Sequence, residues 1–326
     1  SDKPKIAPEK IKEISEICSG EETTESRLIA LAAWMRENYG STMIQALRTV
    51  LPIQEKIKAK EKKYICLDIS EEAGTQLLKE LEQTRFKART RLLRELLEKK
   101  RLDYTHAAKE LGTTSAVVKK FQEQGIIRIE YDEIMRTSLN TGDISGERRL
   151  PLTDEQEAAV KQIQREWKNP SPKPVLIEGV TGSGKTQVYI KLIEQTLSQG
   201  KEAIVLIPEI ALTYQTVRRF YARFGDKVSV INSRQSQGER YDQFKRAKKG
   251  EVQVMIGPRS ALFTPFASLG LIIIDEEHEP SYKSESTPRY HARETAIRRA
   301  VLDHANVVMG SATPSVAAYI KAMNGA

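Results

Sequence analysis

Short, wholly apolar runs alternate with stretches of helical period in the C-terminal half of the chain. The candidate strands are PVLIEG, EAIVLIP, KVSVIN, VQVMIG, LGLIIID and NVVMGS, all within residues 174–311. Apolar runs that lack polar alternation are typical of strands buried on both faces of a parallel sheet. The pattern therefore predicts an α/β fold for residues 151–326, with helices covering both faces of a parallel sheet.

The N-terminal residues 5–60 have a sparser pattern. We expect a short strand in KIKEISEIC, a helix in ESRLIALAAWMRENYG, where apolar residues recur at helical spacing, and a second short helix that stops at Pro52. This piece is too small to bury its own apolar face, so it should belong to a larger unit. The charged run KIKAKEKK at residues 56–63 is expected to be a connector.

The stretch from residue 64 to residue 134 predicts a strand, YICLDIS, and then the helices EEAGTQLLKELEQ, ARTRLLRELLEKK, THAAKELG and SAVVKKFQEQG. Thr105 and Ser115 can cap the last two helices, and Gly112 and Gly125 can end them. The alternating run IIRIEYDEI predicts a strand pair or a wing. This order is typical of a winged-helix domain with residues 115–124 as its recognition helix. The alternative is a helical spacer with a solvated charged face.

Basic residues concentrate in the same stretch. The chain has 52 Lys and Arg against 44 Asp and Glu, a net charge of +8. Residues 85–136 hold thirteen basic and eight acidic residues, which is a local balance of +5. The balance favours a polyanionic partner, and Lys119 and Lys120 on the expected recognition helix are candidate contacts to DNA phosphates. The polar residues 136–150 (RTSLNTGDISGERRL) are a predicted linker.

The composition is that of an ordinary globular protein, with 39% apolar and 29% charged residues in a chain of 326. No apolar run approaches membrane-spanning length, so we expect no membrane partner. The two cysteines, Cys18 and Cys66, lie far apart in the sequence, which favours a reducing compartment. They also exclude an all-cysteine zinc cluster within this sequence. We expect a cytoplasmic protein.

The segment GVTGSGKT has the spacing G-x-x-x-x-G-K-[ST] and lies between an expected strand, VLIE, and an expected helix, QVYIKLIEQTLSQ. Glycines let backbone N–H groups curl around phosphate oxygens, and the helix N-terminus adds its positive end. Lys185 is expected to reach the β- and γ-phosphates of ATP, and Thr186 to ligate Mg²⁺. The predicted ATP-binding residues of this loop are Gly179, Val180, Thr181, Gly182, Ser183, Gly184, Lys185 and Thr186.

Three consecutive carboxylates, Asp275, Glu276 and Glu277, close the apolar run LIII. Nucleotide sites of this type hold Mg²⁺ with an acid at a buried strand end, so Asp275 is the second predicted metal ligand. Glu276 is then placed to orient and deprotonate the attacking water. Lys185, Asp275 and Glu276 form the predicted catalytic set. A direct role for Glu277 stays open, since runs of acids are usually solvated faces.

The residues DEEH at 275–278 form a DExH box and, together with GVTGSGKT, resemble superfamily 2 helicases. That resemblance implies an adenine contact at Gln156, the last residue of LTDEQ. It also implies a link between the nucleotide site and DNA at Ser311 and Thr313 in GSATPS. Taken alone, GSATPS is equally typical of an ordinary strand-to-helix turn.

Four further motifs narrow the resemblance: PEIALT, GPRSALF, DEEHEPSYK and RYHAR, at residues 208–213, 257–263, 275–283 and 289–293. Together they resemble the family of primosomal protein N′, the replication-restart helicase PriA. The resemblance implies an ATP-dependent motor that moves 3′ to 5′ along single-stranded DNA and unwinds forked DNA. It implies primosome proteins and the single-stranded-DNA-binding protein as partners. It divides the chain into the end of a 3′-DNA-end-binding domain (1–60), a winged helix (61–138), a linker (139–150) and a first RecA-like lobe (151–326).

In that family an aromatic-rich loop after the DExH box senses single-stranded DNA. The corresponding residues here are 279–293, which we call the coupling loop. Rings for base stacking are expected at Tyr282, Tyr290 and His291, and cations for phosphates at Lys283, Arg289 and Arg293. Further DNA contacts are expected in the preceding motifs, at Arg259 and Thr213. The alternative is a surface loop with incidental aromatic residues.

The sequence departs from the family at Pro258 in GPRSALF, at Tyr214, where proline is usual, and at Ser284, where glutamine is usual. We expect these changes to tune DNA contacts without changing the function. The second motor lobe with its arginine finger, and the cysteine pairs that bind zinc, have no counterpart in the 326 residues. The chain is therefore expected to be a fragment that is inactive alone, with zinc bound only in the full-length protein.

Two other functions stay open. A winged helix joined to a phosphate-binding loop is also compatible with a DNA-binding regulator in which the nucleotide is only a switch. The same motor lobe also serves RNA helicases and restriction-type translocases, and the resemblance of the coupling loop argues against these.

Overall fold

A computed structural model describes residues 24–51, 60–84, 86–134 and 151–325. The predicted strand KIKEISEIC and the predicted linker lie outside these residues. The described residues form two compact units, one of residues 24–51, 151–233 and 244–325, and the other of residues 60–134 and 234–243. Each unit is considered by itself below.

The first unit is built on a six-stranded sheet in the order β4-β9-β8-β5-β7-β6. Every neighbouring pair runs parallel. Most residues of these strands are buried, because helices cover both faces and leave no polar side. The six predicted strands are confirmed as β4 (Val175–Glu178), β5 (Glu202–Leu206), β6 (Val228–Val230), β7 (Val254–Gly257), β8 (Leu269–Asp275) and β9 (Asn306–Ser311).

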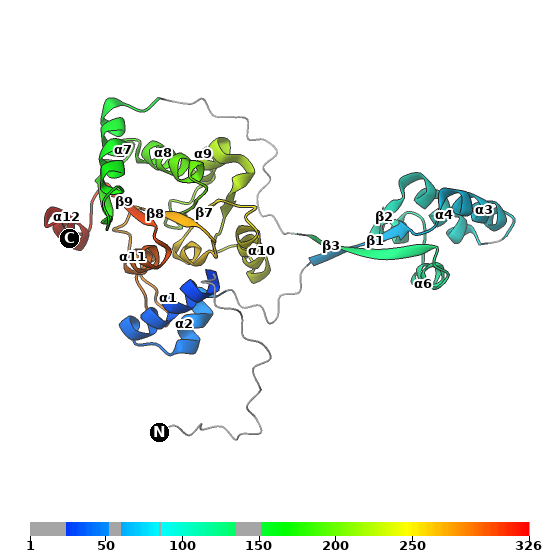
Figure 1. The fold of residues 1–326 in the computed structure, drawn as a ribbon. Helices are drawn as coiled ribbons and strands as arrows, with labels where there is room; N and C mark the ends of the chain where they lie inside the picture. Colours follow the sequence, from blue (N-terminus) through cyan, green and yellow to red (C-terminus); the bar gives the residue numbers. More distant parts are fainter. Residues whose placement is uncertain (1–23, 52–59, 85, 135–150, 326) are drawn as a thin grey trace, which may run out of the picture. The chain divides into compact units, whose positions relative to one another are not determined.

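Helices follow the strands along the chain and cover the sheet on both sides, as predicted. Figure 1 shows α8 and α9 on one side and α11 on the other. None of the helices that the structure describes is both long and apolar enough to cross a membrane. The bounds are α7 (Asp154–Glu166), α8 (Lys185–Ser198), α9 (Tyr214–Phe224), α11 (Ala292–Asp303) and α12 (Val316–Met323), with 3₁₀ turns η2 (Gly225–Lys227), η3 (Arg259–Phe263) and η4 (Pro280–Tyr282). Helix α10 (Gln237–Lys248) begins among residues of the second unit and ends among residues of the first.

The N-terminal helices α1 (Thr24–Tyr39) and α2 (Met43–Val50) share the core of the sheet unit. Helix α1 packs on α11, and the two lie side by side in Figure 1. An ion pair of 2.9 Å joins Arg27 to the buried Asp303, and the Tyr39 hydroxyl donates to Glu294 at 2.8 Å. The expectation that this piece buries its apolar face in a larger unit is confirmed.

The second unit has a three-stranded antiparallel sheet in the order β2-β1-β3. Its apolar core includes Leu92, Leu96 and Phe121, which lie on the inner faces of α4 and α6. The bounds are β1 (Lys60–Leu67), α3 (Glu71–Glu82), α4 (Lys87–Lys99), β2 (Arg101–Asp103), α5 (Tyr104–Lys109), α6 (Ser115–Glu123) and β3 (Ile127–Ile134). The predicted helices are confirmed, and the assignment as a winged helix stays a prediction.

Three local predictions in this unit are wrong. Residues 60–63 belong to β1 and not to a connector, because β3 supplies backbone partners along the whole length of that strand. In the run IIRIEYDEI, residues 127–134 form the single strand β3, so the predicted strand pair is wrong for the same reason, while the alternative of a wing stays a prediction. The helix caps are Asp103 and Thr114, whose side chains accept from the backbone N–H groups of His106 and Val117. The predicted caps, Thr105 and Ser115, lie inside the helices.

Candidate functional site

The turn between β4 and α8 has the backbone of a phosphate-binding loop. Gly182 and Gly184 have φ values of +85° and +83°, in the left-handed region that favours glycine. A side chain at Gly184 would collide with the amide of Gln156, which donates to the Ser183 carbonyl at 3.0 Å. The Gly179 N–H donates to the Ser311 carbonyl at 3.0 Å, which ties the turn to the end of β9.

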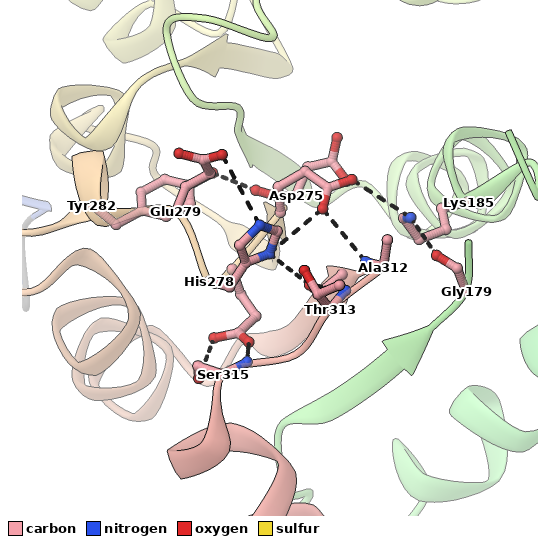
Figure 2. Close-up of polar contacts among 12 residues, drawn as sticks. Gly179, Lys185, Asp275, His278, Glu279, Tyr282, Ala312, Thr313 and Ser315 are labelled. Carbon is pink, nitrogen blue, oxygen red and sulfur yellow. Dashed lines mark hydrogen bonds and ion pairs between the residues drawn. The ribbon is translucent and has the colours of Figure 1, made fainter. Parts of the chain in front are cut away.

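Lys185 brings this turn and the acidic residues together. Its side chain is buried, and its ammonium group donates to the Gly179 carbonyl at 2.6 Å. Figure 2 shows Lys185 beside Gly179, and the same nitrogen lies 3.5 Å from Oε1 of Glu276. Thr186, the predicted metal ligand, is the next residue of α8 and is half-buried. The structure therefore places the predicted lysine and the predicted general base in direct contact.

Asp275 ends β8, and its Oδ1 accepts a hydrogen bond of 3.0 Å from the Tyr189 hydroxyl. Burial raises the pKa of Asp275, while this hydrogen bond opposes the rise. The contact requires a glycine at position 310, because a side chain there would collide with the Tyr189 hydroxyl. The sequence analysis did not predict a role for Tyr189. The available signal was its position four residues after Lys185, which places both side chains on one face of the helix.

Glu276 connects the acids to the GSATPS motif. Its φ of +46° is left-handed, which is uncommon for a residue with a side chain. Oε2 accepts from the Ala312 N–H at 3.4 Å and lies 3.6 Å from Nδ1 of His278. That ring nitrogen is 2.7 Å from the Ser311 hydroxyl (Figure 2). His278 is the last residue of the DExH box but was not among the predicted site residues.

Glu277 has a different environment from the two preceding acids. Its side chain has no exposed surface and accepts from the Ser315 N–H at 2.6 Å and from the Ser315 hydroxyl at 3.0 Å. Arg293 pairs with the same carboxylate at 2.6 Å and donates to the Ser315 hydroxyl at 2.6 Å. We call these three residues the Glu277 cluster. The cluster joins the acidic run, the first turn of α11 and the start of α12.

The cluster corrects the predicted role of Arg293. The prediction gave this arginine to a DNA phosphate, whereas in the structure it neutralises the buried carboxylate of Glu277. A buried carboxylate needs such a partner, since an unpaired charge costs several kcal/mol in the interior.

The structure also contradicts base stacking on Tyr282 and Tyr290. The two side chains are 1% and 4% exposed and belong to the core of the unit. The Tyr282 hydroxyl donates to the carbonyls of Asp275 at 2.6 Å and Leu206 at 3.0 Å. The ring of Tyr290 packs edge-to-face on Phe263, with 5.4 Å between centroids. These rings fill the space under the coupling loop, because a tyrosine can bury its ring and satisfy its hydroxyl at one place.

Backbone contacts hold the coupling loop in one shape. Arg259 donates to the carbonyls of Ser281 at 2.6 Å and Lys283 at 3.0 Å, so it braces the loop from η3. The Ser284 N–H donates to the Tyr290 carbonyl at 2.8 Å. His291 caps α11, with its Nδ1 accepting from the Arg293 N–H at 3.3 Å. Arg259 and His291 therefore have structural contacts in addition to their predicted DNA roles.

The other predicted DNA contacts are divided between surface and interior. Lys283, Arg289 and Thr313 are exposed, whereas Ser311 is buried and contacts His278. Thr213 is exposed, but its hydroxyl caps α9 by accepting from the Thr216 N–H at 3.2 Å. In the second unit, Lys119 and Lys120 are exposed on α6, and Lys119 lies 3.7 Å from Glu123. Gln156 is half-buried at the start of α7.

A family model for the DEAD/DEAH box helicase matches residues 153–320. The chain belongs to the DEAD/DEAH box helicase family. A second family model, the 3′ DNA-binding domain (3′BD) of PriA, matches residues 1–52. The matched helicase region contains the phosphate-binding turn, the acidic run and GSATPS.

The curated relatives that the chain matches include replication restart proteins PriA of several bacteria, which confirms the resemblance to the PriA family. The protein of Bacillus subtilis is 48% identical over 217 residues, which are 67% of this chain and 27% of that protein. The protein of Chlamydia muridarum is 35% identical over 312 residues, which are 93% of this chain and 40% of that protein. The chain therefore spans less than half the length of these relatives.

The structure of RecG bound to a three-way DNA junction is among the solved structures that the chain matches. That match has a TM-score of 0.40 and 24% sequence identity, and covers 55% of this chain and 23% of that chain.

Proposed function

We propose that this chain carries the ATP-binding lobe of a DNA helicase of replication restart, which moves 3′ to 5′ on single-stranded DNA. The observation that carries the proposal is the contact of Lys185 with Glu276, which in turn reaches the Ala312 N–H of GSATPS. The similarity to PriA proteins supports the choice of DNA as the substrate.

The residues at the C-terminal end of β8 and the N-terminal end of α8 fit a Mg²⁺ ion. Thr186 and Asp275 offer oxygen atoms, and Asp275 is held from α8 by Tyr189, one turn after Lys185. Mg²⁺ is usually held by one or two side chains together with water and substrate phosphates, so two protein ligands are enough. When bound, the metal would neutralise charge that develops on the phosphates.

The residues of the chain have separate tasks in ATP hydrolysis. The glycine turn presents backbone donors to the phosphates, and Lys185 reaches the β- and γ-phosphates in place of its contact with Gly179. Glu276 accepts the proton of the attacking water as a general base. Tyr189 keeps the carboxylate of Asp275 oriented.

The coupling between DNA and hydrolysis runs through the interior. The Glu277 cluster joins α11 and α12 to the acidic run, and Tyr282 bonds to the carbonyl of Asp275. A shift of the coupling loop therefore moves the backbone beside Glu276. Lys283 and Arg289 are the exposed cations of the loop and are our candidates for phosphate contacts.

The similarity to PriA proteins supports our proposal for the wider setting. This setting includes forked DNA, primosome proteins, the single-stranded-DNA-binding protein, a cytoplasmic location, and zinc bound elsewhere in a full-length protein. The second unit, with Lys119 and Lys120 on its surface, is proposed to bind DNA as a winged helix.

The test is ATP hydrolysis in a full-length protein that carries this sequence, measured without nucleic acid, with single-stranded DNA and with RNA of equal length. Strong stimulation by DNA alone is expected. Slow hydrolysis that no nucleic acid changes would instead indicate a nucleotide-switched regulator. Stimulation by RNA alone would indicate an RNA helicase. The strand displaced from forks with 3′ or 5′ single-stranded arms gives the direction of movement.

A further inference from the structure

Three loops of the first unit meet beside the nucleotide acids. Strands β8, β5 and β7 are parallel neighbours, so their carboxyl ends share one edge of the sheet. The Ile207 N–H donates to the Gly257 carbonyl at 2.9 Å, and the Tyr282 hydroxyl donates to the Leu206 carbonyl at 3.0 Å. The segment that follows β5, residues 208–214, therefore leaves the sheet between η3 and the coupling loop.

This segment carries exposed apolar side chains on a fixed backbone. Ile210 is 83% exposed and Tyr214 is 58% exposed. The N–H groups of Ala211 and Leu212 both donate to the Pro208 carbonyl, at 2.9 and 3.0 Å. The cap at Thr213 makes Tyr214 the first residue of α9, whose Val217 and Phe220 face the core.

Tyr214 is unusual among the aromatic residues of this unit. Among its described residues, the largely exposed aromatic side chains are Tyr214 and, on α12, Tyr319, which is 46% exposed. The rings predicted for stacking, Tyr282 and Tyr290, are buried. An exposed apolar side chain is common by itself, but here two occur in a hydrogen-bonded segment beside the loop that contacts the catalytic acids.

The charges around this segment are mixed. Lys283 and Arg289 are exposed on the coupling loop, and Arg259 links η3 to that loop. Glu209 and Glu285 are exposed in the same loops. Because cations and acids are both exposed here, the charges alone do not identify a surface for nucleic acid. Stacking of a ring on a base, by contrast, does not depend on the balance of charges.

We propose that Tyr214, with Ile210 in the same exposed segment, forms the base-stacking surface for single-stranded DNA on this lobe, the role that the sequence had suggested for Tyr282, Tyr290 and His291. The proposal rests on the proposed function and names the contact that function requires. Every base has a flat face, so one exposed ring on a fixed turn binds single strands with little sequence preference. A DNA strand held there lies next to the coupling loop, where the Tyr282 hydroxyl donates a hydrogen bond to the carbonyl of Asp275.

The test uses the affinity of the chain for a fluorescent oligo-dT of about twelve nucleotides, a length within the range that single-strand-binding OB folds cover. An oligonucleotide of the same length with abasic residues keeps the phosphates and removes the bases. Tyr214→Ala should weaken binding of oligo-dT roughly 5- to 150-fold, the equivalent of about 1–3 kcal/mol per stacked base. It should leave binding of the abasic strand unchanged, and Tyr214→Phe should keep most of the affinity.

Tyr319→Ala is the matched control, since it removes the other exposed tyrosine of the unit and should leave both affinities unchanged. Equal affinity of Tyr214→Ala and the unaltered chain for oligo-dT would overturn the stacking surface and leave the helicase proposal standing. An equal loss on both strands would overturn it too, because the ring would then act on the phosphates or on the fold. An unaltered chain that binds neither strand would overturn both proposals.

Discussion

The phosphate-binding turn and the coupling loop leave the same edge of one sheet, but they are built in opposite ways. In the turn, Val180, Thr181, Gly182 and Ser183 are exposed, and left-handed glycines set the backbone. In the coupling loop, the rings of Tyr282 and Tyr290 are buried, and Arg293 pairs with the buried carboxylate of Glu277. The backbone groups of the turn are thus available to a ligand, whereas the buried side chains of the loop make their contacts within the protein.

This difference supports the proposal that one lobe binds a nucleotide and responds to DNA. A turn with few internal contacts adapts to phosphates without disturbing the core. A loop that is tied to the core transmits a displacement to the acids beside it, since close-packed interiors move as units. Substitutions should therefore affect nucleotide chemistry in the turn and at the acids, and stability in the coupling loop.

The largest expected effect distinguishes the residue that promotes ATP hydrolysis from the residue that binds the nucleotide. Glu276→Gln should lower DNA-stimulated ATP hydrolysis in a full-length protein by about 10²–10⁴-fold, because the general base is lost. Lys185→Ala should instead weaken nucleotide binding, since the ammonium group that reaches the phosphates is removed. Glu279→Gln is the control, as a neighbouring acid that is partly exposed. Hydrolysis by Glu276→Gln at the unaltered rate would refute the assignment.

The next effect tests the Glu277 cluster. Arg293→Ala should destabilise the chain by about 3–5 kcal/mol, because it leaves a buried carboxylate without its partner. Urea unfolding measures this change. Arg289→Ala removes an exposed arginine of the same loop and should stay within about 0.5 kcal/mol. Adding Glu277→Gln to Arg293→Ala should recover part of the loss. Equal, small effects of the two arginines would contradict the buried pairing.

A smaller loss is expected at the ring that joins the coupling loop to β5. Tyr282→Phe keeps the packing but removes the donor to the carbonyls of Leu206 and Asp275. The expected cost is about 1–3 kcal/mol, the usual penalty for a buried polar group left short of a partner. Tyr319→Phe, at an exposed hydroxyl, should change stability very little. If both variants unfold at the same urea concentration, Tyr282 is not a structural link.

The smallest effect on stability is expected in the second unit. Replacing both Lys119 and Lys120 by alanine should change the free energy of unfolding by less than about 0.5 kcal/mol, because both are exposed. If they contact phosphates, the slope of log affinity for duplex DNA against log salt should fall by about 0.9 for each lysine. Lys79→Ala, an exposed lysine of α3, is the control. An unchanged slope would remove α6 as a DNA-binding helix.

Much of the fold followed from patterns within single segments. The apolar runs of β5 and β8 predicted buried parallel strands, because strands with one face in solvent typically alternate apolar and polar residues. The order of strand, glycine turn and helix predicted the nucleotide site, since the chemistry of phosphate binding is contained in those residues. The family match agrees with both.

Other features depended on contacts between distant segments. Tyr189 and Asp275 are 86 positions apart, and Gly310 is the residue that lets them meet. The packing of α1 against α11 likewise joins two helices that are far apart in the sequence. No local pattern contains such information, and the motif types alone did not distinguish a surface ring from a core ring.

The sequence by itself determined the α/β class, the positions of the strands, the phosphate-binding turn and the acids at the end of β8, because each depends on local periodicity or on spacing within one motif. The tertiary structure alone decided that Tyr282, Tyr290 and Arg293 face inward while Tyr214 faces solvent. The physical reason is that tyrosine and arginine are amphipathic. Their rings, stems and polar groups are satisfied equally by a packed core with partners or by a ligand at the surface, so only the neighbours brought by folding choose between the two.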